Sequence, residues 1–320
     1  MNKNLLKLKK FEPETQDLLA EITHGLKQPQ KQLPSKLFYD KKGSSLFDQI
    51  CGLDEYYLTR TEVAIMNDNI DEIAATLGEH CLLIELGSGS SKKIRLLLEN
   101  LEHPAGYVPI DISEEHLLTS IEILAGDYPG LRILPVYADY TNSFTLPLFN
   151  FPFSNKVVYY PGSTIGNFTP EEAGLFLNGI SRLTGPGSGL LIGVDLVKDT
   201  AVLNKAYNDE AGVTAEFNLN ILRRLNREID SDFNLNDWNH LAFFRAGESR
   251  IEMHLESKRD QLIHLNGDRI PVSKGETILT EYSYKYTLEA FKSLVSDSYR
   301  VETVWTDSES LFSIQYLVAY

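Results

Sequence analysis

The sequence predicts an α/β fold in which a parallel sheet is covered by helices on both faces, with a smaller strand-rich lobe. Between about residues 81 and 197, short apolar runs alternate with segments of helical periodicity, which is typical of a parallel sheet between helices. Several runs between residues 239 and 286 look instead like antiparallel strands joined by short turns. The 320 residues, 42% of them hydrophobic, suffice for one large domain or two modest ones.

The expected elements follow in chain order. The first eighty residues are expected to be helical with loops, including a helix over 62–77 with apolar residues at helical spacing. Strands are expected at 81–86, 106–112, 131–139, 156–162 and 189–197, and helices at 92–101, 114–125, 170–183 and much of 199–225. Ser113 and Thr169 are expected as N-caps, with Pro170 in a first turn. After the antiparallel segment, a helix over 287–296 and strands near 299–305 and 311–319 return to the alternating pattern. This pattern is Rossmann-like, a class that binds ligands beyond the carboxyl ends of its strands.

The charge balance argues against several partners. The formal net charge is −15, whereas nucleic acids and anionic membranes require a basic face. The two cysteines, Cys51 and Cys81, allow neither a disulfide framework nor a zinc site, and we expect no metal. The N-terminus lacks a signal-like apolar stretch, and the longest apolar segment, near 189–197, is too short to cross a bilayer. We therefore expect a cytoplasmic protein.

The segment ELGSGSSKK (85–93) is the first candidate ligand site. A strand runs into a Gly/Ser turn and then a helix, so backbone amides become available to a ligand. A P-loop requires a second glycine just before Lys-Ser/Thr, but Ser90 and Ser91 precede Lys92. A dinucleotide fingerprint requires glycine where Lys92 stands. A nucleoside–methionine cofactor lacks the pyrophosphate and does not demand that third glycine.

Acidic residues end the next two expected strands. Asp111 lies 24 residues after Gly87, close to the spacing of about 20 at which a carboxylate accepts ribose hydroxyls. Asp139 and Tyr140 end the third strand, where a carboxylate can bind the adenine amino group and an aromatic ring can cover the base. The alternative is that these acids only cap turns.

Many short motifs occur together in one order. They are LFYD, DEYYLTRTE, ELGSGSSKK, PIDIS, YADY, YPGSTIGNF, DLVKDT, AYNDEAGVTAEFN, RIEMHL and TEYSYKY. In these motifs the chain resembles the histidine-specific Nα-methyltransferases of ergothioneine biosynthesis, from about residue 35 to the C-terminus. The resemblance implies an enzyme that transfers three methyl groups from S-adenosylmethionine to the α-amine of L-histidine, giving hercynine. The expected cofactor-binding residues are Gly87, Ser88, Gly89, Lys93, Asp111, Asp139 and Tyr140.

The resemblance also assigns the substrate residues. Those implied to hold the amine and carboxylate of histidine are Tyr39, Gly162, Asn167 and Tyr207, of which Asn167, Tyr39 and Gly162 are the candidate catalytic residues. Those implied to recognise the imidazole are Tyr56, Met253, Glu281 and Ser283. Glu281 and Ser283 are two apart, so on a strand they share a face. Phe47, Tyr39 and Tyr160 are candidate aromatic walls for the quaternary ammonium product. From pattern alone, the tyrosines are equally core residues and Glu281 an exposed strand residue.

Other functions remain open at this level. One is N-methylation of another aromatic amino acid such as tryptophan, and another is a non-catalytic S-adenosylmethionine-binding regulator. The GSTIG segment (162–166) has Thr164 where a nucleophile elbow needs serine, which disfavours a hydrolase. We expect a monomer with histidine as its small-molecule partner. The expected methyltransferase domain spans 60–197 and 287–320, and the expected substrate-binding lobe spans 1–59 and 198–286.

Overall fold

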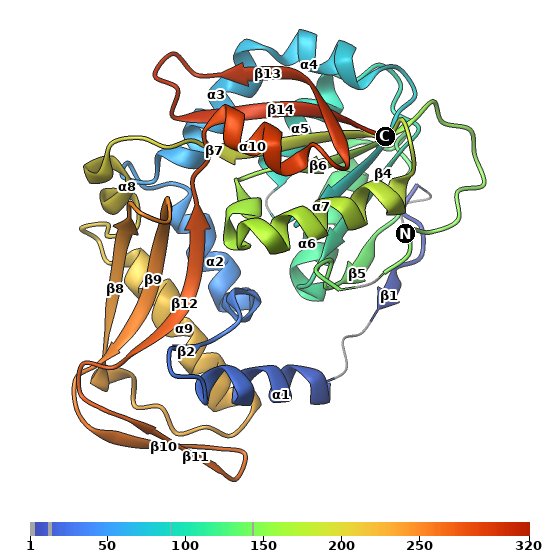
Figure 1. The fold of residues 1–320 in the computed structure, drawn as a ribbon. Helices are drawn as coiled ribbons and strands as arrows, with labels where there is room; N and C mark the ends of the chain where they lie inside the picture. Colours follow the sequence, from blue (N-terminus) through green and yellow to red (C-terminus); the bar gives the residue numbers. More distant parts are fainter. Residues whose placement is uncertain (1–3, 12–14, 90, 143) are drawn as a thin grey trace. The chain divides into compact units, whose positions relative to one another are not determined.

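The computed structural model describes residues 4–11, 15–89, 91–142 and 144–320 (Figure 1). The chain divides into two compact units, and each is described by itself. Unit 1 holds the described part of Met1–Glu12 together with Leu58–Val197 and Lys285–Tyr320. Unit 2 holds the described part of Pro13–Tyr57 together with Lys198–Tyr284. No helix among the described residues is both long and apolar enough to span a bilayer.

Unit 1 is built on an eight-stranded sheet. In spatial order its strands are β1 (Lys9–Phe11), β5 (Val136–Ala138), β4 (Gly106–Asp111), β3 (Leu82–Leu86), β6 (Lys156–Tyr160), β7 (Gly189–Asp195), β14 (Phe312–Ala319) and β13 (Tyr299–Thr306). The first six are parallel, and β14 and β13 form an antiparallel hairpin at the edge beside β7. The sheet is therefore mixed, whereas the alternation in the sequence predicted a parallel one. Strands β3, β4 and β7 are buried along their whole length, as continuous apolar runs predict.

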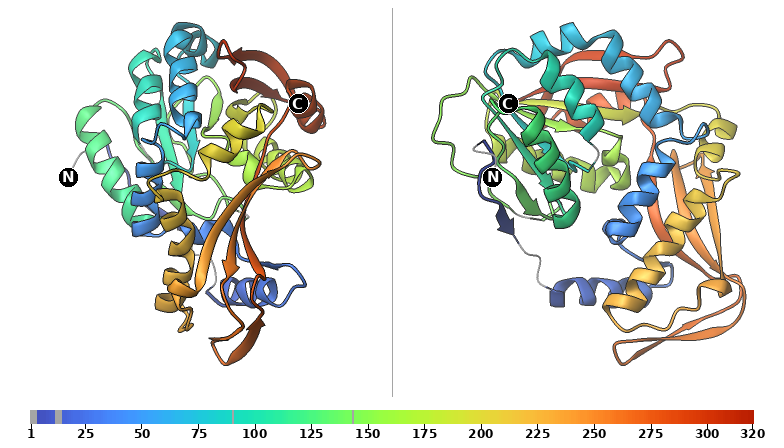
Figure 2. Two further views of the ribbon diagram at one scale, coloured as in Figure 1. Left: turned by 90° about the vertical axis from the view of Figure 1, so that its left-hand side faces the viewer. Right: turned by 180° about the vertical axis from the view of Figure 1, so that it is seen from behind.

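Helices cover both faces of this sheet, as expected. They are α3 (Tyr57–Asp68), α4 (Ile70–Leu77), α5 (Ser91–Asn100), α6 (Glu114–Asp127), α7 (Pro170–Thr184) and α10 (Leu288–Val295). Helices α7 and α10 pack together on one face, and α4, α5 and α6 lie on the other (Figures 1 and 2). Thr169 caps α7 in a reciprocal capping box with Glu172, as the sequence predicted. Ser113 occupies the N-cap of α6, but its side chain makes no capping hydrogen bond.

Three expectations for unit 1 were wrong in detail. The helix expected over 62–77 is two helices. The side-chain amide of Asn69 donates to the Ile65 carbonyl at 2.8 Å, and the backbone of Asn69 leaves the helical conformation. The third strand is confined to β5, since Pro135 lacks the N–H needed to extend the ladder. The described residues 4–11 belong to unit 1 rather than to the lobe expected over 1–59, because β1 pairs with β5.

Unit 2 has a four-stranded sheet and a separate hairpin. The sheet order is β2 (Lys31–Gln32), β12 (Thr277–Tyr284), β9 (Arg250–Ser257) and β8 (Trp238–Arg245), and the hairpin pairs β10 (Gln261–Leu265) with β11 (Asp268–Val272). Strands β8, β9 and β12 are antiparallel, as expected, while the two-residue β2 adds a parallel pairing that the sequence did not suggest.

Four α-helices and two short turns of 3₁₀ helix complete the described part of unit 2. They are α1 (Thr15–Leu26), η1 (Ser35–Phe38), α2 (Lys41–Ile50), α8 (Thr200–Ala206), α9 (Val213–Glu228) and η3 (Leu235–Asp237). Helix α9 packs against α2 on one side and against β8 and β9 on the other. The core of this unit therefore lies along α9, whose buried residues include Phe217, Ile221 and Leu225.

Candidate active site

The cofactor loop of unit 1 follows β3. Gly87 has a φ of +76°, which only glycine adopts freely. The amides of Gly87 and Ser88 both donate to the Ile110 carbonyl, at 2.9 and 3.3 Å. Strand β3 lies between β4 and β6, where the strand order reverses. The loop therefore stands at the topological switch point, the usual ligand position in such sheets.

Four of the expected cofactor residues, Gly87, Gly89, Asp111 and Tyr140, meet at this loop. A Cβ placed on Gly87 would lie 3.6 Å from the Tyr140 hydroxyl. A Cβ placed on Gly89 would lie 3.3 Å from Cε1 of His116 and 4.0 Å from Oδ2 of Asp111. The ends of β3, β4 and the segment after β5 are thus within reach of one small ligand.

The two acids also cap turns, which was the alternative left open by the sequence. Oδ1 of Asp111 accepts the Ser113 amide at 2.8 Å, and burial raises the pKa of this carboxyl. Asp139 accepts the amide and hydroxyl of Thr141 through Oδ1 and the Asn142 amide through Oδ2. A carboxylate can accept about four hydrogen bonds. Capping therefore leaves each acid able to bind a ligand as well.

The loop carries an unsatisfied polar group. The Ser88 side chain is 2% exposed, and its hydroxyl has no hydrogen-bond partner among the described residues. Buried polar atoms are almost always satisfied, so an unsatisfied one beside a glycine turn indicates a ligand position. A hydroxyl, a buried acid and an aromatic ring beside a glycine turn suit the ribose and base of S-adenosylmethionine.

The second loop of unit 1 follows β6, the neighbour of β3. Gly162 has a φ of +77° and Ser163 a φ of +57°. The Gly162 amide donates to both carboxylate oxygens of Glu62, at 2.9 and 3.0 Å. The Lys93 ammonium donates to the same carboxylate at 2.6 Å. The turn η2 (Thr164–Asn167) follows and ends at the half-buried Asn167.

An aromatic cluster lies behind this loop. Tyr140 and Tyr160 meet edge to face at 5.9 Å, and Phe176 lies 5.4 Å from Tyr160. Phe168 stacks on Phe176 at 5.1 Å. Tyr160 therefore packs with the proposed adenine-covering ring in unit 1, whereas the other two candidate aromatic walls, Tyr39 and Phe47, belong to unit 2.

In unit 2, Tyr39 is placed by the residue that follows it. Asp40 caps α2 by accepting the Gly43 amide at 2.7 Å, and it also binds Asn220 and Arg227 of α9. Although partial burial opposes ionisation, these hydrogen bonds hold the pKa of Asp40 below its usual value. The LFYD motif thus ends in a carboxylate that fastens the chain at Tyr39 to α2 and α9.

Four expected substrate residues of unit 2 form a continuous aromatic chain. The ring of Tyr39 lies 5.8 Å from that of Phe47, and Phe47 lies 6.3 Å from Tyr56. Tyr56 lies 6.3 Å from Tyr207, and the Tyr207 hydroxyl donates to the Ser283 hydroxyl at 2.7 Å. Residues from four separate stretches of sequence are brought together in this way.

The remaining substrate residues lie on the sheet at the end of that chain. Glu281 of β12 pairs directly with Met253 of β9, and Ser283 pairs with Ile251, so Glu281, Ser283 and Met253 share one face. Burial, together with negative charge that includes Glu281, raises the pKa of Tyr56. We call these seven residues of unit 2 the ring cluster: Tyr39, Phe47, Tyr56, Tyr207, Met253, Glu281 and Ser283.

A β-bulge sets the orientation of Glu281. The pairing of β12 with β9 shifts between Leu279 and Glu281, which leaves Thr280 as the extra residue. The Thr280 hydroxyl contacts Oδ1 of Asn218 at 2.7 Å, and the Asn218 amide donates to the His254 carbonyl at 2.9 Å. Asn218 is fully buried in α9. This helix therefore holds the bulge that directs Glu281 toward the ring cluster.

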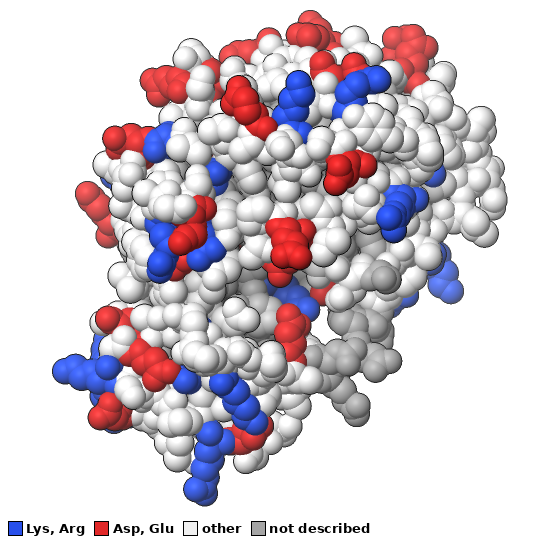
Figure 3. Space-filling view, in the orientation of Figure 1, with Lys and Arg blue, Asp and Glu red and all other residues white. Residues whose placement is uncertain are grey.

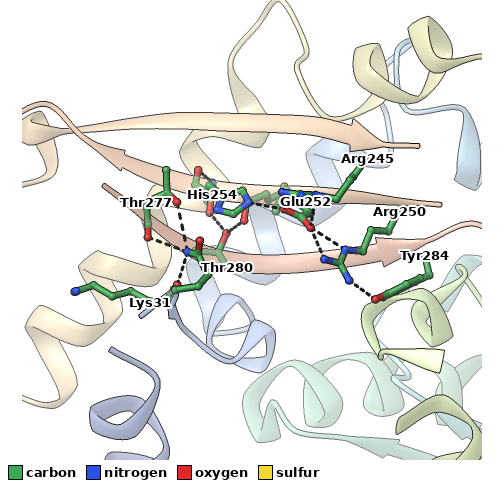
Figure 4. Close-up of polar contacts among 11 residues, drawn as sticks. Lys31, Arg245, Arg250, Glu252, His254, Thr277, Thr280 and Tyr284 are labelled. Atoms are coloured by element: carbon green, nitrogen blue, oxygen red, sulfur yellow. Dashed lines mark hydrogen bonds and ion pairs between the residues drawn. The ribbon is translucent and has the colours of Figure 1, made fainter. Parts of the chain in front are cut away.

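The opposite face of the same sheet carries a separate ion network (Figure 4). Glu252 accepts hydrogen bonds from Arg250 at 2.5 Å and contacts Nε2 of His254 at 3.0 Å. The Arg250 guanidinium lies 4.0 Å above the centroid of Tyr282. Of these contacts, the one between Arg250 and Tyr282 joins β9 to β12 on this face.

Four residues at these sites escaped the sequence analysis. Glu62 lies in the DEYYLTRTE motif, and Phe217 and Asn218 lie in AYNDEAGVTAEFN, so the motifs contained them without indicating a role. Phe217 packs against Tyr39 and Phe47, at 5.9 and 6.0 Å. His116, beside Gly89 and Asp111, carried no signal in the sequence.

Charged side chains of both signs are interspersed over the described residues on the face in Figure 3.

Comparison of the sequence with known proteins identifies the family to which the chain belongs. A family profile described as "histidine-specific methyltransferase, SAM-dependent" matches residues 18–319. A histidine N-alpha-methyltransferase of Mycolicibacterium smegmatis is 39% identical over 308 residues, which cover 94% of each chain. A protein of the same name from Mycobacterium tuberculosis is 37% identical over 305 residues, 93% of each chain. Ergothioneine biosynthesis protein 1 of Neurospora crassa is 34% identical over 291 residues, which cover 88% of this chain and 32% of that protein.

Proposed function

The chain belongs to the family of histidine-specific, S-adenosylmethionine-dependent methyltransferases, and from that premise we propose that it trimethylates the α-amine of L-histidine to give hercynine. The fold and the matched motifs suit an enzyme of this kind. With hercynine as its product, the proposed reaction belongs to ergothioneine biosynthesis, the pathway that appears in the name of the Neurospora crassa relative.

The observation that carries the substrate assignment is the ring cluster. A carboxylate, two tyrosine hydroxyls and a serine hydroxyl gather beside the apolar Met253. An imidazole has one N–H donor and one ring nitrogen acceptor in its neutral form. Glu281 can accept the N–H, and a hydroxyl such as that of Tyr56 can donate to the other nitrogen. An indole would leave the second group unsatisfied, which disfavours tryptophan.

The chemistry asks little of the protein beyond alignment. S-adenosylmethionine supplies a methyl group on a sulfonium that is already activated. The protein must hold the α-amine unprotonated and in line with that methyl group, and it must exclude water. We assign this to Asn167, which can accept from the amine and donate to the carboxylate, and to the Gly162 carbonyl. In unit 2, we assign the carboxylate to the Tyr39 hydroxyl and to the Tyr207 hydroxyl, which must exchange the hydrogen bond that it donates to Ser283 for one to the carboxylate.

Three rounds of transfer require a site that tolerates an increasingly bulky cation. The first two products are amines that must lose a proton before the next round, and the third is a quaternary ammonium. Aromatic rings stabilise such a cation by about 0.5–2 kcal/mol. Tyr39 and Phe47 are the rings of the ring cluster that we assign to this task. The acidic net charge further supports an enzyme without a nucleic-acid partner, and a cytoplasmic location and a monomeric state complete the proposal.

The test is a reaction with equal concentrations of histidine and tryptophan, followed by mass spectrometry. We expect histidine to be consumed, hercynine to accumulate and three equivalents of S-adenosylhomocysteine to form. Methylation of tryptophan in preference to histidine would reassign the substrate. Binding of S-adenosylhomocysteine without turnover of either amino acid would point to a regulatory protein.

A further inference from the structure

The carboxylate of Glu62 is a buried charge for which the proposed reaction has no direct use. Its side chain is fully buried in α3. It accepts the Gly162 amide through both oxygens, at 2.9 and 3.0 Å, and the Lys93 ammonium at 2.6 Å. The Lys93 side chain is itself only 15% exposed. One carboxylate thus joins the helix after the cofactor loop to the loop that follows β6.

Strand β7 is shaped to admit this carboxylate. A Cβ placed on Gly193 would lie 2.4 Å from Oε1 of Glu62, so a larger residue at that position would displace the carboxylate. The loop after β6 is also held from its other side, where the Ser163 hydroxyl accepts the backbone amide of Asp195 at 2.9 Å. The left-handed turn at Gly162 and Ser163 is therefore held at both ends by specific hydrogen bonds.

We propose that Glu62 is a positioning residue that fixes the Gly162 turn, and thereby the carbonyl that aligns the α-amine of the substrate. The inference rests on the proposed function for the role of that carbonyl. Glu62 does not touch the reacting atoms in this account. It acts through the Gly162 amide, and the ion pair with Lys93 holds the carboxylate in place. A displacement of about 1 Å in an aligned reactant can cost on the order of 10² in rate.

Two double variants isolate the hydrogen bond from the charge. Glu62→Gln with Lys93→Met keeps an oxygen acceptor for the Gly162 amide, whereas Glu62→Met with Lys93→Met removes it at almost the same volume. Both variants lose the ion pair and carry no unpaired buried charge. Their difference therefore reports on the acceptor alone. Asp127→Asn, which breaks the surface pair with Arg95, is a control in the same unit.

The first measurement is kcat for histidine at saturating S-adenosylmethionine, scaled to the number of sites that bind S-adenosylhomocysteine. We expect the glutamine variant to exceed the methionine variant by at least tenfold in kcat. Their dissociation constants for S-adenosylhomocysteine should agree within threefold. Equal kcat values would overturn the proposal, because the ion pair alone would then explain Glu62. The Asp127→Asn control should match the unmodified enzyme.

The second measurement does not depend on histidine being the substrate. Hydrogen exchange of peptides covering residues 157–168 reports on the Gly162 turn directly. We expect faster exchange in the methionine variant than in the glutamine variant. Equal exchange would reject the positioning role even if histidine is methylated. If the methionine variant exchanges faster than the glutamine variant but the unmodified enzyme does not methylate histidine, the positioning role is retained and the proposed substrate is rejected.

Discussion

The two parts of the proposed site are built by different means. In unit 1, most of the expected cofactor residues stand in loops directly after parallel strands, where backbone geometry places them, as at Gly87, whose amide donates to the Ile110 carbonyl. In unit 2, the ring cluster consists of side chains from separate stretches of sequence, joined through contacts such as that of Tyr207 with Ser283. The first kind of site depends on local turns and tolerates change in distant elements. The second depends on several elements packing in one register.

Removing the acid of the ring cluster should produce the largest effect. Glu281→Leu leaves the imidazole N–H without an acceptor, and we expect kcat/KM for histidine to fall at least 100-fold, following the size of such penalties in buried recognition sites. The dissociation constant for S-adenosylhomocysteine, measured by calorimetry, should stay within about twofold. A parallel loss of cofactor affinity would mean that the two parts are not separable.

The complementary change lies in unit 1. Asp111→Asn weakens the charged acceptor expected to bind the ribose hydroxyls, and we expect S-adenosylhomocysteine to bind about 10- to 100-fold more weakly, since hydrogen bonds to charged groups contribute about 1.5–3 kcal/mol. Calorimetry with the nucleoside adenosine should show a similar ratio. An unchanged affinity would leave Asp111 with only its capping bond to Ser113.

The dependence of the ring cluster on packing can be tested through Asn218. Asn218→Leu removes the bonds to Thr280 and His254, and we expect a loss of about 2 kcal/mol in stability, typical of a broken buried network. Because the bulge orients Glu281, KM for histidine should rise about tenfold. Asn178→Leu, which removes a bond to Ser298 in unit 1, is the matched control and should leave KM for histidine unchanged. A rise in KM in both variants would indicate general destabilisation.

The smallest effect on the reaction is expected beneath the cofactor loop. Burial raises the pKa of Glu85 to about 8, although the Tyr107 hydroxyl donates to it. A carboxyl whose pKa is higher in the folded than in the unfolded state binds more protons when folded, so its contribution makes the protein less stable as pH rises from about 4.5 to 8. Glu85→Gln lacks this penalty. In urea unfolding, the free energy of unfolding of the variant minus that of the unmodified protein should therefore increase between pH 5 and 8 and then remain constant. A decrease of this difference over the same range would contradict a raised pKa for Glu85.

The sequence was most informative where strand, turn and helix follow one another directly. The periodicity of 81–197 placed the strands and helices of unit 1, and the Thr169 cap appeared at the predicted residue. It failed where a single side chain or a distant partner decided the outcome. Asn69 divides one helix into two, and β1 joins the sheet through pairing with β5. Neither feature changes the spacing of apolar residues in the sequence. A side-chain hydrogen bond does not alter that spacing, and pairing between distant segments depends on which edge of the sheet is available.

The same division holds for the site. Glu281 and Ser283 share a face of β12 as their spacing predicts, but the bulge at Thr280 that orients them depends on Asn218 of α9. The residues Glu62 and His116 gained meaning only when α3 and α6 were seen beside the loops of unit 1.

By itself, the sequence determined the class of fold, because strand periodicity and turn chemistry are local properties of the chain, and the resemblance of its motifs indicated the family and the substrate residues that we expect. The tertiary structure alone decided how Tyr39, Tyr56 and Tyr207 are connected through ring contacts and which buried acid holds Gly162 in place. Those outcomes depend on the packing of segments far apart in sequence, and the free energy of such contacts is not determined by any one segment alone.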